Sequence, residues 1–599
     1  MKIKTKFQMH QNIKFGIIVM IGLILSIYVS DFFCQILSPN LQLYIDLEKY
    51  NEDKTIQIFE YDKEVESINS DDQKNYLYDS NYKNHEIHLE LIVDSGGLHA
   101  VYLNDSKVDN IKKISDYILN DTDQKYGNVY CINTNIHGQR HYIINLFSFI
   151  LFFFIYILVV MRLKKTGGDF SVFIYSKSSL DIIGIKPIIT SIIVAVVSVV
   201  IHYGCDISAI SQAIYMWQNG IDIYQLSTIE RYKGAIYYMW PYEGMLLAGY
   251  SLPSYLVNIF IHNFGSRDYL WAHAILYKVF NMILCNMIVI SMLSYLLETG
   301  KISKEKVKKI YLWSIFNPVT FYVAIIFIQL DILPVYFITL GILLLNKKET
   351  TFLSAVLLAL GFSCKMTIWI LIPVVLLLFY WIWYKEKDCR RKSAIQILLF
   401  FIILFSMVLL PRFVDTPIKR ALAHIPQAER IWYTTIPYVD SSAYFYVTIG
   451  ALILVFMLVI SRINLKWNLS EMINTSLLMI GIITLVFSGT ILSTPSFYLH
   501  TLPACVIMYA MCENGFERSI KGLPTFLIIV IWMFMPEGDI SASLAFLGKE
   551  PIFTKIYQIL SANGKIVKWQ SLLLTVAASA MFSYAVIFYR MITSKGDQL

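Results

Sequence analysis

Charged residues are scarce in this sequence, and most of them stand outside its long apolar stretches. Only 16% of the 599 residues are charged, whereas 56% are hydrophobic. The apolar residues gather in runs longer than a soluble core helix needs, and roughly 20 such residues are enough to cross a bilayer. This composition argues against a soluble enzyme and predicts an all-α polytopic membrane protein with about fourteen spans. The first span is expected near Phe15–Phe33 and the last near Leu572–Tyr589.

Paired cysteines, glycine-rich phosphate loops and internal repeats are also lacking. The eight cysteines are scattered without disulfide or metal-ligand spacing, and only Cys131 falls clearly within an external region. No glycine-rich phosphate loop stands on the basic side of the chain, so no nucleotide-sugar site is expected there. No repeat of the kind that builds many transporters is evident, which weakens a transporter interpretation.

Lys and Arg cluster at the N-terminus and in alternate short loops, which include "MRLKKTGG", "GKISKEKVKKI", "YKEKDCRRKS" and "SRINLKWN". Because positive residues near helix ends resist translocation, these loops and both termini are predicted to be cytoplasmic, in a cell membrane. This topology accounts for the net charge of +7, so nucleic-acid binding is not expected. The first span has no small-residue cleavage site after it and is predicted to be a retained anchor.

The domain organisation follows from these spans. Residues 1–40 are predicted to form a cytoplasmic tail and anchor, 41–140 a small β-rich extracytoplasmic domain, 141–186 a second span with a cytoplasmic loop, and 187–599 the transmembrane core. Stretches such as "KTIQIFEYD" and "EIHLELIVD" alternate apolar and polar residues and predict strands, which we expect to form a small sandwich. One segment, "VDNIKKISDYILN", has helical spacing. Glycan binding and a purely structural role are equally compatible with this domain.

The acid Asp206 follows an apolar span directly, in "SIIVAVVSVVIHYGCDISAISQAIYMWQNG". Apolar residues recur after it at helical spacing and predict a helix lying in the membrane interface. Asp206 is therefore either the N-cap of this helix or a general base at the surface where lipid-borne and aqueous reactants meet.

Two further polar positions interrupt apolar segments. In "FNPVTFYVAIIFIQLDILPVYFITLGILLL", Gln329 and Asp331 separate two such segments. A charge at the hydrocarbon centre costs about 3 kcal/mol, so Asp331 is predicted to lie in an external turn. The same alternation places Lys365, in "LLALGFSCKMTIWILIP", at the external face, although a lysine that only snorkels to the interface explains this position as well.

The order of these motifs resembles the C-type (GT-C) membrane glycosyltransferases, and most closely the bacterial polyprenol-phosphate-mannose-dependent mannosyltransferases. An acid after a span is followed by "A-x3-W-x-N-G-x-D-x-Y", "Y-x-W-P-Y-E-G", "N-P", "Q-L-D-x-L-P" and "G-x3-K-x7-P". Where the family commonly has glycine before the glutamine, this chain has Ile328. The matching residues are Asp206, Asn219, Gly220, Asp222, Tyr224, Tyr238, Pro241, Asn317, Pro318, Gln329, Asp331, Pro334, Gly361, Lys365 and Pro373.

The resemblance implies that a hexose or pentose, mannose among them, leaves polyprenyl phosphate with inversion and joins a glycan, lipid or protein acceptor outside the membrane. Asp206 would be the general base. Lys365 and then Arg412 are the candidates for binding the donor phosphate. His500, in "SFYLHTLP", either joins them or is an interfacial histidine held by hydrogen bonds. Positioning of sugar, acceptor or loop is expected from Gln329, Asp331, Asp222, Tyr224, Tyr238 and Glu243.

No cofactor is expected, and the partners are the lipid-linked donor, the acceptor and membrane lipids. Asp206, Asp222 and Glu230 could supply oxygen ligands to a divalent metal, but carboxylates in a loop are more often simply solvated. The rival interpretations are an oligosaccharide ligase or polymerase with a large late catalytic loop, a transporter or flippase with charges inside the bundle and broken helices, and a noncatalytic receptor.

Overall fold

The computed structural model describes side chains in a helical part of the chain and the backbone alone in a set of strands. The described residues are 173–200, 267–347, 351–385, 390–405, 435–437, 444–464, 466–491, 495–533 and 566–593, the strands within 43–133, and isolated positions within 211–257 and 555–559. Backbone contacts separate two units. The first comprises Met1–Lys165, Ala209–Trp240 and Phe405–Ile425, and the second comprises Thr166–Ser208, Pro241–Leu404 and Pro426–Leu599.

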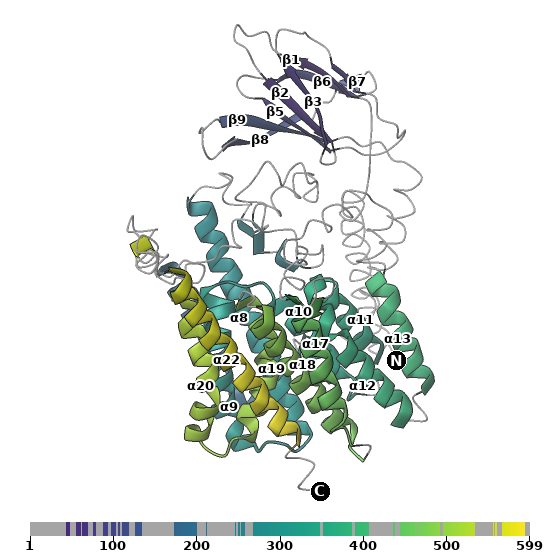
Figure 1. The fold of residues 1–599 in the computed structure, drawn as a ribbon, viewed down its shortest axis with the longest axis vertical. Helices are drawn as coiled ribbons and strands as arrows, with labels where there is room; N and C mark the ends of the chain where they lie inside the picture. The colour runs from purple at the N-terminus through teal and green to yellow at the C-terminus, as the bar shows by residue number, and fades with distance from the viewer. Residues whose placement is uncertain are drawn as a thin grey trace, which may run out of the picture. The chain divides into compact units, whose positions relative to one another are not determined.

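The strands of the first unit pair antiparallel in two sheets (Figure 1). One sheet has the order β4-β1-β6-β7 and the other β3-β2-β5-β9-β8. That a separate extracytoplasmic domain is built here stays a prediction. The strands are β1 Leu43–Leu47, β2 Thr55–Glu60, β3 Lys63–Asn69, β4 Tyr76–Tyr78, β5 His88–Val93, β6 Leu98–Leu103, β7 Ser106–Lys107, β8 Ile111–Ile118 and β9 Tyr126–Asn133.

The helix predicted for "VDNIKKISDYILN" is wrong, because residues Ile111–Ile118 form strand β8. β8 pairs antiparallel with β9 from Ile111 opposite Ile132 to Ile118 opposite Tyr126, and its register shifts between Lys113 and Ser115. Such a bulge inserts one residue into the two-residue alternation of a strand. Isoleucines spaced three and four residues apart therefore fit a bulged strand as well as a helix.

The second unit is a bundle of helices with one short hairpin, β10 Thr435–Pro437 and β11 Tyr444–Tyr446 (Figure 1). Short 3-10 or π segments, labelled η, join several of the helices. The helical elements are α3 Leu180–Ile183, α4 Lys186–Val200, α8 Arg267–Glu298, α9 Lys304–Ile315, η3 Val319–Ile326, α10 Ile332–Leu344, α11 Thr351–Phe362, η4 Met366–Leu371, α12 Ile372–Lys385, α13 Arg390–Leu404, α17 Val447–Ile460, α18 Leu469–Ile491, η7 Pro495–Thr501, α19 Leu502–Met511, α20 Gly515–Met533 and α22 Ile566–Thr593.

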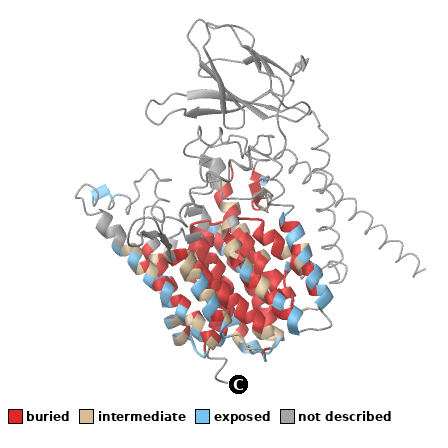
Figure 2. Ribbon diagram, turned by 45° about the vertical axis from the view of Figure 1, so that its right-hand side comes forward, coloured by how far each residue is buried: buried red, intermediate tan, exposed pale blue. Residues whose placement is uncertain are grey.

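The bundle has the character of a membrane protein. Among the described residues, four helices are long and apolar enough to cross a bilayer, or up to five if the bent pair of α9 and η3 forms one span. Buried residues fill the interior of the bundle, while exposed ones, many of them apolar, lie along its outside (Figure 2). Exposed apolar side chains on such helices are expected where lipid replaces water. The prediction of an all-α membrane core is confirmed at this level, and the count of about fourteen spans stays a prediction.

The pair of helices α9 and η3 is interrupted by a sharp bend. α9 ends at Ile315, η3 begins at Val319, and the two axes differ by 50°. Pro318 stands at the break, and the side-chain carbonyl of Asn317 accepts a hydrogen bond from the backbone of Val319 at 2.9 Å. The Asn317 amide donates to the hydroxyl of Tyr509 in α19 at 2.6 Å. A side chain thus replaces part of the hydrogen bonding that the break removes from the backbone.

Glycines let neighbouring helices approach closely. A Cβ atom on Gly361 of α11 would lie 2.6 Å from the side chain of Ile338 in α10, and one on Gly341 of α10 would lie 2.8 Å from Leu358. Small residues at such crossings allow close packing, from which helices in a membrane gain most of their association energy. Gly361 therefore fixes the distance between α10 and α11 just before Lys365.

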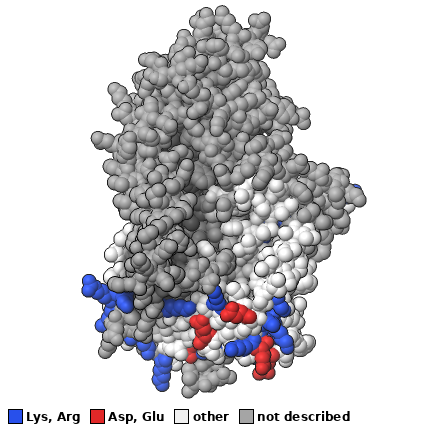
Figure 3. Space-filling model, turned by 180° about the vertical axis from the view of Figure 1, so that it is seen from behind, with Lys and Arg blue, Asp and Glu red and all other residues white. Residues whose placement is uncertain are grey.

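Basic side chains gather at one end of the bundle (Figure 3). This basic end is formed by the turns α8–α9, α12–α13 and α17–α18 and by the end of α22, because consecutive helices alternate in direction. Its exposed residues include Lys301, Lys304, Lys385, Arg390, Arg391, Lys392, Arg462, Lys466 and Arg590. The turns that lead from η3 to α10, from α11 to α12 and from α18 to α19 lie at the opposite ends of these helices. We call that end of the bundle the polar-turn end.

Candidate functional site

A buried ion pair lies at the polar-turn end. The Lys365 ammonium donates to both carboxylate oxygens of Asp331, each at 3.1 Å. Their side chains are only 6% and 1% exposed. Asp331 stands at the N-cap position of α10 but makes no side-chain cap. Its carboxylate is committed to the lysine instead, so it holds the ammonium in a fixed position.

The local backbone explains how Lys365 reaches this place. α11 ends at Phe362, and Lys365 itself is extended, with φ −162° and ψ 126°, before η4 begins. The indole of Trp369 donates to the carbonyl of Phe362 at 2.9 Å, which satisfies one of the free carbonyls at the end of α11. The interruption of the apolar run at Lys365 is therefore also a break in the helix.

His500 joins this pair from a third turn. It lies in η7, is 2% exposed, and is acted on electrostatically by both Asp331 and Lys365. Its Nε2 atom has no hydrogen-bond partner among the described residues. The Phe497 ring lies on the same segment, with Lys365 Nζ 5.3 Å from its centre and the imidazole centre at 6.3 Å. The Phe497 ring thus lies near both the histidine and the lysine of the ion pair.

The segment that carries Gln329 and Asp331 has an unusual backbone. η3 is a π-helix, and the amide of Phe327 donates to the carbonyl of Tyr322 at 2.7 Å. Ile328 follows with φ 53°, in the left-handed region that a β-branched residue rarely adopts. This is the position where the resembling family commonly has glycine. Such backbone strain costs of order 1–3 kcal/mol and persists only where the surroundings enforce it.

Asn281 of α8 supplies part of that enforcement. Its amide nitrogen donates to the carbonyl of Ala324 at 2.7 Å and to that of Gln329 at 3.2 Å, one on each side of Ile328. Its carbonyl accepts from the hydroxyl of Tyr250 at 2.5 Å. Neither Asn281 nor Tyr250 was predicted from the sequence. An asparagine inside a long apolar helix was the available signal, because polar residues within spans commonly bind neighbouring helices or serve function.

The predicted site residues divide into two groups. The structure brings Lys365, Asp331, Gln329 and His500 to the polar-turn end, all nearly completely buried. The others lie outside the described residues; they are Asp206, Asp222, Tyr224, Tyr238, Glu243 and Arg412. In the described part of the chain, no three His, Cys, Asp or Glu side chains form a group that could hold a metal ion.

α4 runs toward the polar-turn end. Asn286 of α8 contacts Pro187 and Ser191 near the start of α4, while Val279, nearer the beginning of α8, lines the groove that Ala195, further along α4, also lines. The two helices are therefore antiparallel. Asn281, which donates to the carbonyl of Gln329, lies between Val279 and Asn286 on α8. α4 therefore extends beyond the position of Asn281 and ends at Val200, six residues before Asp206 in the sequence.

The Asp331 carboxylate holds the Lys365 ammonium, and His500 has an Nε2 atom without a hydrogen-bond partner among the described residues. A lysine ammonium and an imidazole are groups that can bind anions. Comparisons with protein families, with curated proteins and with solved structures found no match for this chain.

Proposed function

We propose that the protein is an integral-membrane glycosyltransferase that moves a sugar from polyprenyl phosphate to an extracytoplasmic glycan, lipid or protein acceptor. The observation that supports this most is the Lys365–Asp331 ion pair with His500 beside it, buried at the end of the bundle opposite the basic end. With the basic end in the cytoplasm, the polar-turn end faces outward, where a lipid-borne donor meets its acceptor.

In this proposal each group has a separate task. Asp206 accepts the proton of the acceptor hydroxyl as that oxygen forms the new bond to the anomeric carbon. The bond from that carbon to the lipid phosphate breaks, and the phosphate leaves with the electron pair. Lys365 and His500 stabilise the charge that gathers on the phosphate, an effect that is strongest where water is excluded. Gln329 and Asp331 keep the cation and the turn in place.

The test is transfer of a radiolabelled sugar from polyprenyl phosphate in proteoliposomes, with native protein and with Asp206→Asn. Removal of a general base lowers the rate about 10²- to 10⁴-fold. Asp181→Asn is the matched control, because Asp181 is an exposed acid in the short helix before α4 and should leave transfer unchanged. Undiminished transfer by the Asp206→Asn variant would refute the role of Asp206 as general base and leave only its role as a helix cap.

A transporter or flippase of lipid-linked sugars is the second candidate. It is favoured by two features: the sharp bend that interrupts the α9 and η3 pair, and the buried ion pair at the polar-turn end of the bundle. Transporters commonly build substrate sites from such interrupted helices. The same proteoliposomes separate the two functions: movement of labelled polyprenyl-phosphate sugar between leaflets without transfer to any acceptor would favour the transporter.

A further inference from the structure

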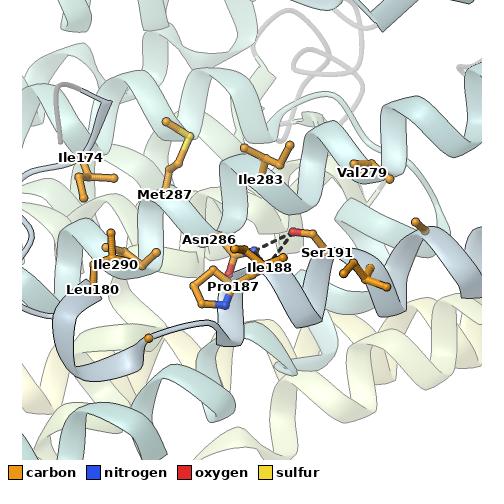
Figure 4. Close-up of a pocket in the computed structure, with 13 residues that line it drawn as sticks. Ile174, Leu180, Pro187, Ile188, Ser191, Val279, Ile283, Asn286, Met287 and Ile290 are labelled. Atoms are coloured by element: carbon orange, nitrogen blue, oxygen red, sulfur yellow. Dashed lines mark hydrogen bonds between the residues drawn. The ribbon is translucent and has the colours of Figure 1, made fainter. Parts of the chain in front are cut away.

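An apolar groove lies between α4 and α8. Its volume is about 530 Å³, and Ile188, Ile192, Ile283 and Met287 are among the residues that line it (Figure 4). Ile188 and Ile192 are 59% and 57% exposed, so the groove opens on the outside of the bundle. On a membrane-embedded bundle that side faces hydrocarbon.

The polar atoms in the groove are already paired with one another. Asn286 donates toward Pro187 and Ser191, each at 3.4 Å, and the Ser191 hydroxyl donates to the Pro187 carbonyl at 2.9 Å (Figure 4). The Asn286 carbonyl accepts from Tyr311 at 2.6 Å. The groove therefore offers an occupant apolar contact and little hydrogen bonding, which fits a hydrocarbon chain rather than a sugar or a peptide backbone.

The size of the groove fits one acyl chain. It follows α8 from Val279 to Ile290, roughly 16 Å at 1.5 Å per residue, which is about half of the 30 Å hydrocarbon thickness. A chain that reaches from one leaflet to the bilayer centre has these dimensions, whereas a polyprenyl chain is much longer.

The segment at one end of the groove carries a net positive charge. Ile174, Leu180 and Gly184 line that end, and the same stretch, residues 173–186, contains Lys177 and Lys186 against the single acid Asp181. Basic residues next to a membrane surface attract anionic head groups. We propose that this groove binds an acyl chain of an anionic glycerophospholipid, with its phosphate beside Lys186, as a site separate from any sugar donor.

The test is photolabelling of the full chain in liposomes with phosphatidylglycerol or phosphatidylcholine that carries the same diazirine-bearing acyl chain. Labelled peptides are mapped by mass spectrometry. The expected result is labelling of residues 279–290 that is several-fold stronger with phosphatidylglycerol. Lys186→Gln should lower this preference about fivefold, the effect of roughly one basic residue at an anionic surface. Equal labelling by the two lipids would overturn the proposal.

Two neighbouring isoleucines supply a matched pair of variants. Ile192→Trp fills the groove, whereas Ile193→Trp adds the same bulk at a residue that is 44% exposed and does not line it. Labelling should be lost in the first variant and kept in the second, with both eluting as native protein in gel filtration. Labelling that survives Ile192→Trp, stronger labelling by a polyprenyl phosphate probe, or cross-links from the groove to a second copy of the chain would each refute the proposal.

Discussion

Replacing Lys365 by Met tests whether the buried pair with Asp331 carries as much energy as its geometry indicates. With Nζ 3.1 Å from each carboxylate oxygen, the attraction is about 5 kcal/mol at an effective dielectric constant of about 20. Loss of one partner leaves the other charge buried without compensation, which typically costs about 3–5 kcal/mol. We therefore expect Lys365→Met and Asp331→Leu each to lower the free energy of unfolding by about that amount.

The double variant should recover most of this loss, because two apolar side chains of similar size replace a buried pair at little cost. Its destabilisation should be at least about 3 kcal/mol smaller than the sum of the two single effects. The assay is equilibrium unfolding in mixed micelles, followed by tryptophan fluorescence. Additive effects, or single effects below about 1 kcal/mol, would refute the reasoning. If the pair also binds donor phosphate, the stable double variant will still be inactive in transfer.

A second ion pair in the same bundle is the control. Lys521 Nζ lies 2.6 Å from a Glu517 carboxylate oxygen, closer than the atoms of the buried pair, but these side chains are 30% and 34% exposed. An exposed pair one helical turn apart contributes only about 0.3–0.5 kcal/mol. Lys521→Met should therefore leave the free energy of unfolding nearly unchanged, which shows that burial rather than distance decides the cost.

Two predictions concern the backbone around this pair. The free energy of unfolding should be about 1–2 kcal/mol higher for the Ile328→Gly variant than for the Ile328→Ala variant, because only glycine tolerates φ 53° without strain. At most positions the alanine variant is the more stable of the two. An alanine variant as stable as the glycine variant would disprove the strain. Gly361→Ala should lower the free energy of unfolding by about 1–3 kcal/mol, since the new Cβ would lie 2.6 Å from the Ile338 side chain. Gly515→Ala should leave it unchanged, because a Cβ there would have no atom within 4 Å. Thermal unfolding of the four variants in detergent measures both effects.

Apolar run length and Lys/Arg placement predicted a helical membrane core with basic residues at one end, because both properties depend on local composition alone. The positions that interrupt apolar runs, Asp331, Lys365 and His500, were also visible in the sequence. Their burial around one another was not, because it depends on which turns pack together. The turn that contains Asp331 was expected to lie at the external face. Nothing in the local sequence predicts that Lys365, 34 residues away, forms an ion pair with it.

Other features depended on partners that the sequence does not reveal. Ile328 carries no sign of a left-handed backbone; only the glycine of the resembling family points to it. Asn281 binds two carbonyl groups about 45 residues further along the chain, a contact set by helix packing. The error at Ile111–Ile118 arose because a bulge gives isoleucines the spacing of a helix.

The burial of the apolar stretch of α18 has a consequence for biosynthesis. The most apolar stretch of this span has all of its residues buried inside the bundle, and its Gly481 lies against Phe588 of α22. α22 is synthesised about 100 residues after α18 begins, and membrane chains emerge from the ribosome N-terminus first. Until α22 arrives, one face of α18 must meet lipid or a temporary partner. A chain that stops before Ile566 therefore leaves α18 without one of its packing partners, and quality control has a reason to recognise it.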